Sequence, residues 1–269
     1  MKWGVVVKPN DSKARKLAEE IISFLKDEEI YLEKKIAEEL GREGYSIGEL
    51  NNIADIVLTV GGDGTILYAL QEIEKPIFAV NCSAMGFLTE VNAKFAKSGM
   101  ERILRGDYNI EERARLKVFL EGRRVEDASN ELTIQTANVA KIIEFSILIN
   151  DELVDRLRAD GIIIATPTGA TGYALSVGGP IVDPGVDAAI IAPIAPFKLA
   201  SRPWIVPIDK NICVELSEKS KDAKLVIDGR NSYDVHAGER VCATLSEKKS
   251  RFIRFGESFY QTVRLKLVR

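Results

Sequence analysis

The residues with the clearest chemical potential are the five at 61–65, Gly-Gly-Asp-Gly-Thr, which directly follow the apolar run 56–60. Such an apolar run is typical of a buried parallel strand. Glycines at the end of that strand leave the main chain bare, so that a phosphate can approach the backbone N–H groups of the loop and of a following helix. Asp63 is unusual in this setting, because a carboxylate repels a phosphate. We expect it to accept a proton from an attacking hydroxyl or to help hold a metal ion, and the loop therefore predicts phosphoryl transfer.

A Gly-Gly-Asp-Gly run is also common as an ordinary turn. It is not a Walker A loop, because no Gly-Lys-Ser/Thr follows, and it is not Gly-x-Gly-x-x-Gly, because the sixth position is Leu67. Its place between a strand and a predicted helix at 65–72 favours a functional loop, since open α/β sheets bind ligands at the carboxyl ends of their strands.

A second segment of interest is 160–180, where the apolar run 162–165 leads into a loop rich in hydroxyl groups and glycines. A helix is predicted next, at 170–177. Small residues leave space, Thr and Ser supply compact hydrogen-bonding groups, and Tyr173 supplies a flat face on which a base can stack. This composition predicts a pocket for a planar ligand with a polar rim, the alternative being a tight strand–helix junction that binds nothing.

The pair Asn130 and Glu131 adjoins a strand-like stretch that begins at Leu132. A carboxylate next to a carboxamide can hold the two hydroxyl groups of a ribose, although two polar residues at a strand edge are usually only solvated. The sequence has a single histidine, His236, which we expect at the surface. Catalysis by a Ser-His-Asp triad is therefore poorly supported, and a carboxylate is the expected base.

The elements that must position these residues change in type along the chain. The first hundred or so residues alternate between strand-like and helix-like stretches, with Asp11 in an expected helix cap, and this alternation predicts a parallel sheet covered by helices. Strands are predicted at 3–8, 30–32, 56–60 and 76–81, and helices at 13–26, 33–40 and 65–72.

From about Tyr108 onward the strand-like runs are short and helical signal is scarce. These runs are 116–121, 132–135, 142–149, 162–165, 212–216, 224–227 and 240–245. We predict an α/β domain of residues 1–108 that carries the glycine loop and a β-rich domain of residues 109–251. The C-terminal tail, 252–269, is predicted to return to the first domain.

Bulk composition excludes several classes of protein. The 269 residues include 37 basic and 40 acidic side chains, a net charge of −3, so nucleic acid is not an expected partner. The apolar start is too short for a signal peptide, and the uncharged stretch 162–182 contains prolines and glycines that argue against a membrane span. We expect a cytoplasmic protein in which Cys82, Cys213 and Cys242 are reduced core thiols, with no structural zinc site.

Together these segments resemble the NAD kinase family. The glycine loop is shared with diacylglycerol, sphingosine and 6-phosphofructo-kinases, whereas the segment 160–180 resembles the signature of NAD kinases alone, and Asn130-Glu131 is similar to their Asn-Glu pair. Two further stretches are also similar, the run 192–203 and Ile227-Asp228-Gly229. The resemblance covers nearly the whole chain and implies transfer of the γ-phosphoryl group of ATP, or of polyphosphate, to the 2′-hydroxyl of the adenosine ribose of NAD, giving NADP.

The resemblance implies a role for each matching residue. Asp63 would be the catalytic base, with Gly62, Gly64 and Thr65 at the phosphates, and Phe87 would contact the adenine. Mg²⁺ or another divalent cation would be bound mainly through the ATP phosphates, with no protein side chain assigned as its ligand.

The NAD-binding residues would follow in the second domain. Asn130 and Glu131 would hold adenosine-side hydroxyls, and Asp160, with Arg158 beside it, would face the nicotinamide end, often across a subunit contact in a homodimer or homotetramer. Thr171, Tyr173 and Ser176 would line the adenine pocket, and Ala195 would form the wall on the nicotinamide side. His-Ser is common in the family at the two positions after Pro196, where this chain has Phe-Lys, so no role of that histidine carries over.

Two other functions remain open on the sequence. A kinase of the same chemistry with a lipid or sugar alcohol as acceptor is disfavoured by the segment 160–180. A regulator that binds NAD or NADP without turnover is disfavoured by Asp63, because a pure sensor has no need of a carboxylate among phosphates.

Overall fold

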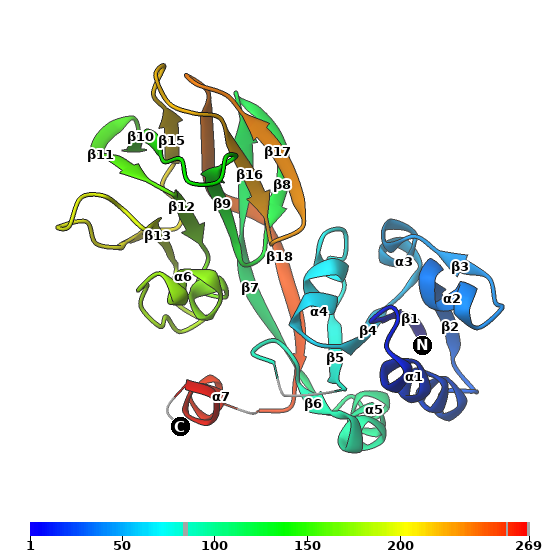
Figure 1. Ribbon diagram of the computed structural model, residues 1–269. Helices are drawn as coiled ribbons and strands as arrows, with labels where there is room; N and C mark the ends of the chain where they lie inside the picture. The colour runs from blue at the N-terminus through cyan, green and yellow to red at the C-terminus, as the bar shows by residue number, and fades with distance from the viewer. Residues whose placement is uncertain (83–85, 257, 268–269) are drawn as a thin grey trace. The chain divides into compact units, whose positions relative to one another are not determined.

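A computed structural model describes residues 1–82, 86–256 and 258–267 (Figure 1). The chain divides into two units, the first made of Met1–Glu112 with Ser250–Arg269 and the second of Arg113–Lys249. One long strand, β18 (Arg240–Arg254), contains the boundary between Lys249 and Ser250.

The first unit has a parallel sheet, as predicted. Its strand order is β3 (Gly44–Tyr45), β2 (Glu29–Glu33), β1 (Lys2–Val7), β4 (Ile56–Gly61) and β5 (Ile77–Asn81). The short β6 (Val91–Asn92) and the end of β18 also pair with β5 in parallel. Every residue of β4 and β5 is buried, which explains why both strands read as continuous apolar runs.

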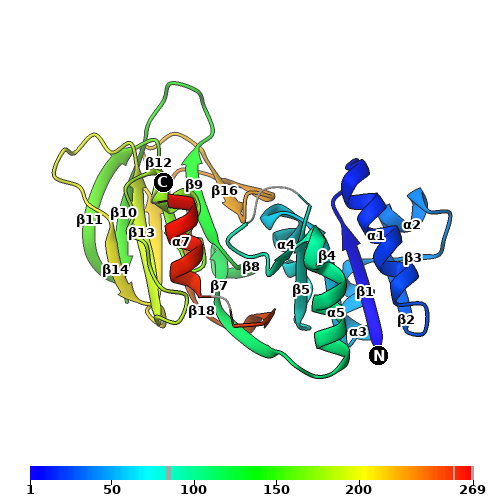
Figure 2. The same ribbon diagram turned by 90° about the horizontal axis from the view of Figure 1, so that it is seen from below.

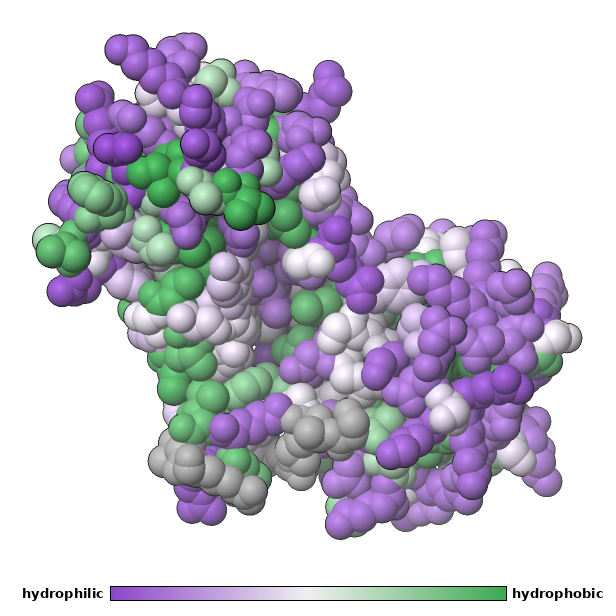
Figure 3. Space-filling model, in the orientation of Figure 1, coloured by the Kyte–Doolittle hydropathy of each residue, from purple (hydrophilic) through white to green (hydrophobic). Residues whose placement is uncertain are grey.

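Helices cover both faces of this sheet. The side chains of β1 alternate, because Val5 packs with one cluster that includes residues of α1 and α5, whereas Val6 packs with another that includes α3 and α4. Helices α1 and α5 lie side by side (Figure 2). The outer surface of α1, α2 and α3 is mostly hydrophilic, as amphipathic helices require (Figure 3). The helices are α1 (Ser12–Phe24), α2 (Lys34–Glu39), α3 (Ile47–Ile53), α4 (Asp63–Leu70), η1 (Ala93–Phe95), α5 (Ala96–Leu104) and α7 (Phe259–Leu267).

The predicted cap of the first helix is confirmed. The Asp11 carboxylate accepts hydrogen bonds from the N–H groups of Lys13 (3.1 Å) and Ala14 (3.2 Å), which are among the donors that a helix start leaves unpaired. The helix ends earlier than predicted, with Leu25 as its C-cap.

The second unit contains antiparallel strands in two layers. One layer has the order β14 (Trp204–Pro207), β13 (Ala188–Ile194), β12 (Gly161–Ala165), β9 (Glu131–Thr136), β16 (Ala223–Ile227) and β17 (Asn231–Val235). The other has β11 (Glu152–Ala159), β10 (Ile143–Ile149), β15 (Ile212–Leu216) and β18, followed by β7 (Asn109–Leu120) and β8 (Arg123–Ala128). Inward-facing residues of both layers form one apolar core.

Strand β12 is buried on both of its faces. Ile162 and Ile164 belong to the core between the layers, whereas Ile163 and Ala165 pack on the outer side with Ala170 and other small residues of the segment that follows β12. That segment contains the short helices η2 (Gly169–Thr171) and α6 (Tyr173–Ser176). The prediction of a continuous helix at 170–177 was therefore wrong, because Gly172 adopts a non-helical conformation with φ −95° and ψ −132°.

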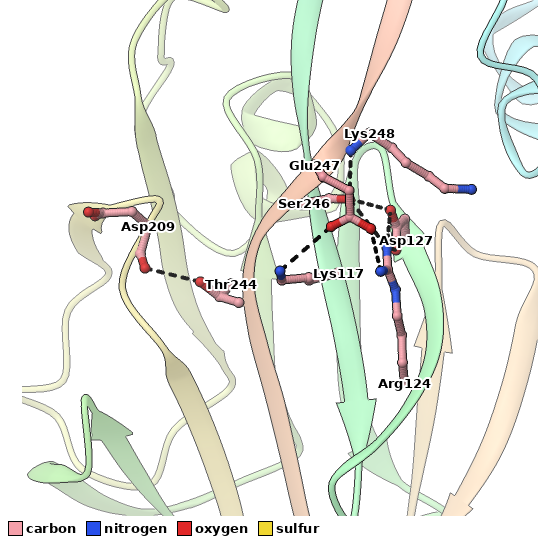
Figure 4. Close-up of polar contacts among 8 residues, drawn as sticks. All are labelled: Lys117, Arg124, Asp127, Asp209, Thr244, Ser246, Glu247 and Lys248. Atoms are coloured by element: carbon pink, nitrogen blue, oxygen red, sulfur yellow. Dashed lines mark hydrogen bonds and ion pairs between the residues drawn. The ribbon is translucent and has the colours of Figure 1, made fainter.

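Polar side chains tie β18 to β7 and β8 (Figure 4). Glu247 pairs with Arg124 and lies 3.6 Å from the Lys117 ammonium, and Asp127 accepts from Arg124 (2.7 Å) and from the Ser246 hydroxyl. The hydrogen bond from Arg124 is the largest cause that lowers the pKa of Glu247, to about 2. On the other edge of β18, the Thr244 hydroxyl donates to the Asp209 carbonyl (3.0 Å).

The prediction of three reduced thiols was wrong for two of them. Cys213 on β15 and Cys242 on β18 are directly opposite residues of adjacent antiparallel strands, and their sulfur atoms form a disulfide. Strand register brings them together across 29 positions of sequence, which the cysteine spacing could not reveal. Cys82 is free and half-buried, and its burial raises the pKa of the thiol to about 11.

Within the described part of the chain, no helix combines the length and the apolar character that crossing a bilayer requires.

Candidate active site

The glycine loop lies where β4 ends and α4 begins, with Gly62 as the N-cap of the helix. A Cβ atom placed on Gly62 or Gly64 would meet nothing within 4 Å, so the space above the main chain is open at both positions. Gly61 serves another purpose, because its Cβ would lie 2.3 Å from the Thr65 hydroxyl. Thr65 is buried against Gly61, and its N–H donates to the Gly62 carbonyl (2.9 Å), so an anion at the helix N-terminus would meet the bare main chain at Gly62 and Gly64 first.

Asp63 is the first residue of α4, and its carboxylate is held by two backbone groups. Its oxygens accept hydrogen bonds from the N–H groups of Phe87 (2.8 Å) and Leu88 (3.1 Å). Gly86 makes this contact sterically feasible, since a Cβ there would lie 1.8 Å from an Asp63 oxygen. The carboxylate is half-buried and has a fixed orientation, as a group that accepts a proton in a defined direction requires. The sequence analysis did not identify Gly86 or Leu88 as part of this arrangement.

Phe87 lies beside the C-terminal helix. Its half-buried ring has the Lys266 ammonium 4.5 Å from its centroid, a cation–π contact between α7 and the segment that holds Asp63. All the residues predicted at the phosphates, together with Asp63 and Phe87, thus belong to the first unit.

Asn130 and Glu131, in the second unit, have fixed main chains and unpaired side-chain oxygens. The Thr166 N–H donates to the Asn130 carbonyl (2.8 Å), and the Thr166 hydroxyl donates to the Ser129 carbonyl (2.7 Å). Among the described residues, no partner exists for the buried Asn130 Oδ1 or Glu131 Oε2. Buried polar atoms normally have partners, so these two oxygens favour a ligand with hydroxyl or N–H donors.

The segment 160–180 packs directly against this pair. Ala165 on β12 is the cross-strand partner of Glu131 on β9. Gly169 approaches the Asn130 main chain so closely that a Cβ would lie 2.2 Å from its carbonyl oxygen, and a Cβ on Gly172 would lie 3.2 Å from Glu131 Oε2. Two motifs that are separate in sequence therefore lie against each other.

Burial is the largest cause that raises the pKa of Glu131, to about 8, and the nearby Asp228 carboxylate adds to it. Near neutral pH, Glu131 can therefore hold a proton and donate a hydrogen bond as well as accept one.

The three residues predicted to line the pocket follow next in the chain. Thr171 is half-buried and donates to the Thr168 carbonyl at 3.4 Å, a long hydrogen bond that leaves its hydroxyl weakly committed. Tyr173 is 38% exposed at the start of α6, and Ser176 is exposed at its end. The Tyr173 ring is thus accessible to a planar ligand.

Arg158, Asp160 and Ala195 lie at the opposite end of β12. The Asp160 N–H donates to the Ile194 carbonyl (3.0 Å), immediately before Ala195, whose φ of +45° turns the chain. Five strand residues separate Asp160 from the end near Glu131, a distance of roughly 15 Å at the usual rise per residue. The predicted NAD-binding residues of the second unit thus form two groups, one at each end of β12.

Arg158 and Asp160 are both exposed. The Arg158 guanidinium lies 5.8 Å from the centroid of the Phe197 ring, and its carbonyl accepts from the Phe197 N–H (2.8 Å).

No side-chain cluster suited to a metal ion occurs among residues 1–82, 86–256 and 258–267.

Comparison with known proteins gives consistent results for both units. Residues 3–108 match the family model described as the ATP-NAD kinase N-terminal domain, and residues 129–255 match that of the ATP-NAD kinase C-terminal domain. The chain is similar to an NAD kinase of Methanothermobacter thermautotrophicus, with 41% identity over 274 residues, which covers 100% of this chain and 96% of the relative.

Two solved structures share the fold. Yeast NADH kinase in complex with NADH has a TM-score of 0.92 at 25% identity and covers 100% of this chain and 87% of its own. An NAD kinase from Archaeoglobus fulgidus in complex with ATP has a TM-score of 0.81 at 30% identity and covers 97% of this chain and 96% of its own.

Proposed function

The chain belongs to the NAD kinase family and phosphorylates NAD, and we propose that it transfers the γ-phosphoryl group of ATP to the 2′-hydroxyl of the adenosine ribose, giving NADP. The observation that carries this assignment is the Asp63 carboxylate, held by two N–H groups at a helix N-terminus next to glycines with open space above them.

Asp63 acts as the general base. A carboxylate is a much weaker base than a ribose alkoxide, so Asp63 does not remove the hydroxyl proton before attack. It accepts the proton as the bond to phosphorus forms, while positioning and electrostatic stabilisation of the phosphoryl group lower most of the barrier. The phosphates bind over the open main chain at Gly62 and Gly64, with Thr65 beside them in the first turn of α4.

Asn130 and Glu131 bind hydroxyl groups of the adenosine side of NAD, which would supply the partners that Asn130 Oδ1 and Glu131 Oε2 lack. Tyr173 stacks on the adenine, with Thr171 and Ser176 at the rim, and Phe87 also contacts the base. Arg158, Asp160 and Ala195 bind the nicotinamide end. An extended dinucleotide suits two groups of residues at opposite ends of one strand.

A divalent cation, Mg²⁺ in the simplest case, would be bound through the phosphates of ATP and would supply charge neutralisation on the transferred group. Asp63 is the side chain nearest the open glycine loop that could add an oxygen ligand. We also propose a homodimer or homotetramer in the cytoplasm, where the substrates NAD and ATP are available, and in which the exposed Arg158 and Asp160 take part in a subunit contact.

The experiment that tests this assignment is a turnover assay with NAD, Mg²⁺ and either ATP or inorganic polyphosphate, run side by side. We expect NADP to form with ATP. Turnover with polyphosphate alone would replace ATP as the assigned donor, and equal phosphorylation of diacylglycerol or fructose 6-phosphate would contradict NAD as the specific acceptor.

A further inference from the structure

Asp228 occupies the turn between β16 and β17 and is almost fully buried, with 9% of its surface exposed. Its main chain is left-handed, with φ +47°, and the next residue, Gly229, has φ +66°. Aspartate tolerates such a conformation better than most residues, and Asp-Gly is a preferred pair in tight hairpin turns. The Asp228 N–H donates to the Glu131 carbonyl (3.0 Å), which continues the pairing of β16 with β9.

The Asp228 carboxylate accepts three consecutive backbone N–H groups. Oδ2 accepts from Ser129 (2.8 Å), and Oδ1 accepts from Asn130 (2.7 Å) and Glu131 (3.1 Å). Hydrogen bonds to an ionised acceptor are stronger than neutral ones, so one side chain fixes three successive peptide groups at the start of β9.

We propose that Asp228 is a positioning residue for NAD: by holding the main chain of 129–131, it presents the side chains of Asn130 and Glu131 to the hydroxyl groups of the adenosine side. This inference rests on the proposed function of that pair. Asp228 does not itself touch the substrate in this account. Mutation of a residue that orients a binding group through hydrogen bonds commonly lowers the affinity for the ligand by a large factor, even though the residue does not touch the ligand.

The charges around this site support the same role. Asp228 faces Glu131 from the β16–β17 turn, and its negative charge adds to the burial that raises the pKa of Glu131 to about 8. Burial also raises the pKa of Asp228, whereas its three N–H donors and the buried Arg115 on β7 favour the ionised form. The residues of β12 opposite Glu131 are apolar and contribute no charge.

The test compares Asp228→Asn with a matched control, Asp151→Asn. Asp151 is also left-handed, with φ +64°, but it lies in the exposed β10–β11 turn, where its carboxylate pairs with Arg240 (2.7 Å). We expect Asp228→Asn to raise the KM for NAD roughly tenfold or more while the KM for ATP changes less than twofold. Asp151→Asn should leave both constants unchanged.

A pH profile separates positioning from a merely structural role. In the natural chain, the dissociation constant for NADP should change with pH around the pKa of Glu131. Asp228→Asn removes a like charge, so this inflection should move to lower pH. A lower Tm together with an unchanged KM for NAD and an unmoved inflection would overturn the proposal.

Two further variants complete the test. Asp228→Gly suits the left-handed backbone and removes the carboxylate, so it should raise the KM for NAD as Asp228→Asn does; if both variants fail to fold while Asp151→Asn folds, the role is structural and the proposal is overturned. Glu131→Ala, which removes both side-chain oxygens, tests the underlying assignment. An unchanged KM for NAD in folded Glu131→Ala refutes the proposed role of Glu131, whereas a raised KM there with none in Asp228→Asn refutes the Asp228 proposal alone.

Discussion

At the scale of single residues, the two carboxylates assigned to NAD phosphorylation have opposite surroundings. Asp63 is half-buried and is oriented by two N–H groups, whereas Glu131 is 9% exposed and one of its oxygens has no partner within the described chain. An accessible and oriented carboxylate suits proton transfer, and a buried one with an unpaired oxygen suits recognition of a hydroxyl. The different surroundings of the two acids therefore support the different roles that we propose for them.

The buried Glu131 predicts a pH-dependent cost in stability. Because its folded-state pKa is raised to about 8, its contribution to folding is fully present below its unfolded pKa of about 4.5 and is lost as pH rises through 8. Without bound nucleotide, Glu131→Gln should therefore gain Tm relative to the natural chain as pH is raised from 5 to 9.

The control for that measurement is Glu247→Gln. The pKa of Glu247 is lowered to about 2, so this residue stays ionised from pH 5 to 9 and its substitution should give a constant offset in Tm. If the difference in Tm between the natural chain and Glu131→Gln stayed constant from pH 5 to 9, the raised pKa of Glu131 would be contradicted.

At the scale of elements, continuous apolar runs predicted the buried strands well. Strands β4, β5 and β12 were all located, because each is buried on both faces. Helix α3 was not predicted, although the sequence contains a pattern typical of a helix start: Ser46 and Glu49 form a capping box. Helix α5 and strands β13 and β14 were also missed.

Contacts of the candidate site that depend on strand register could not be predicted from the sequence. The family resemblance identified candidate site residues in the sequence. No local pattern, however, showed that Ala165 pairs with Glu131 or that the Asp228 carboxylate accepts from the Ser129 N–H, 99 positions away. Asp228 was noted as part of a similar stretch and given no role. Its contacts arise only from the pairing of β16 with β9.

The disulfide between β15 and β18 gives a prediction at this scale. It closes a loop whose ends are 29 positions apart, which is worth about 3–4 kcal/mol in the chain-entropy account. Reduction, or the double substitution of Cys213 and Cys242 by Ala, should lower Tm by roughly 10 °C.

Thiol titration provides the control for that prediction. The unfolded, unreduced protein should show one reactive thiol, Cys82, and the reduced protein three. Three thiols without reductant, or an unchanged Tm after reduction, would contradict a stabilising disulfide.

At the scale of the whole molecule, the residues that we propose for catalysis and NAD binding belong to both units. The first unit matches the N-terminal domain model of the family, and the second matches the C-terminal domain model. Arg158 and Asp160 are exposed, and we have proposed that they take part in a subunit contact. If each pocket receives Asp160 from a neighbouring subunit, mixing inactive Asp63→Asn with inactive Asp160→Ala should restore part of the NADP formation. No restored activity despite demonstrated subunit exchange would show that each chain uses its own Asp160.

The central claim is that Asp63 is the base in transfer of a phosphoryl group to the 2′-hydroxyl of NAD. The most direct measurement is kcat for NADP formation from ATP and NAD by Asp63→Asn, with Asp55→Asn as the control, because Asp55 precedes the other end of β4 and accepts the Lys2 N–H (2.8 Å). We predict a fall in kcat of about 10²–10⁴-fold for Asp63→Asn, which should still fold although it loses one of the two N–H hydrogen bonds, and no fall for Asp55→Asn. Near-normal turnover by folded Asp63→Asn would contradict the account.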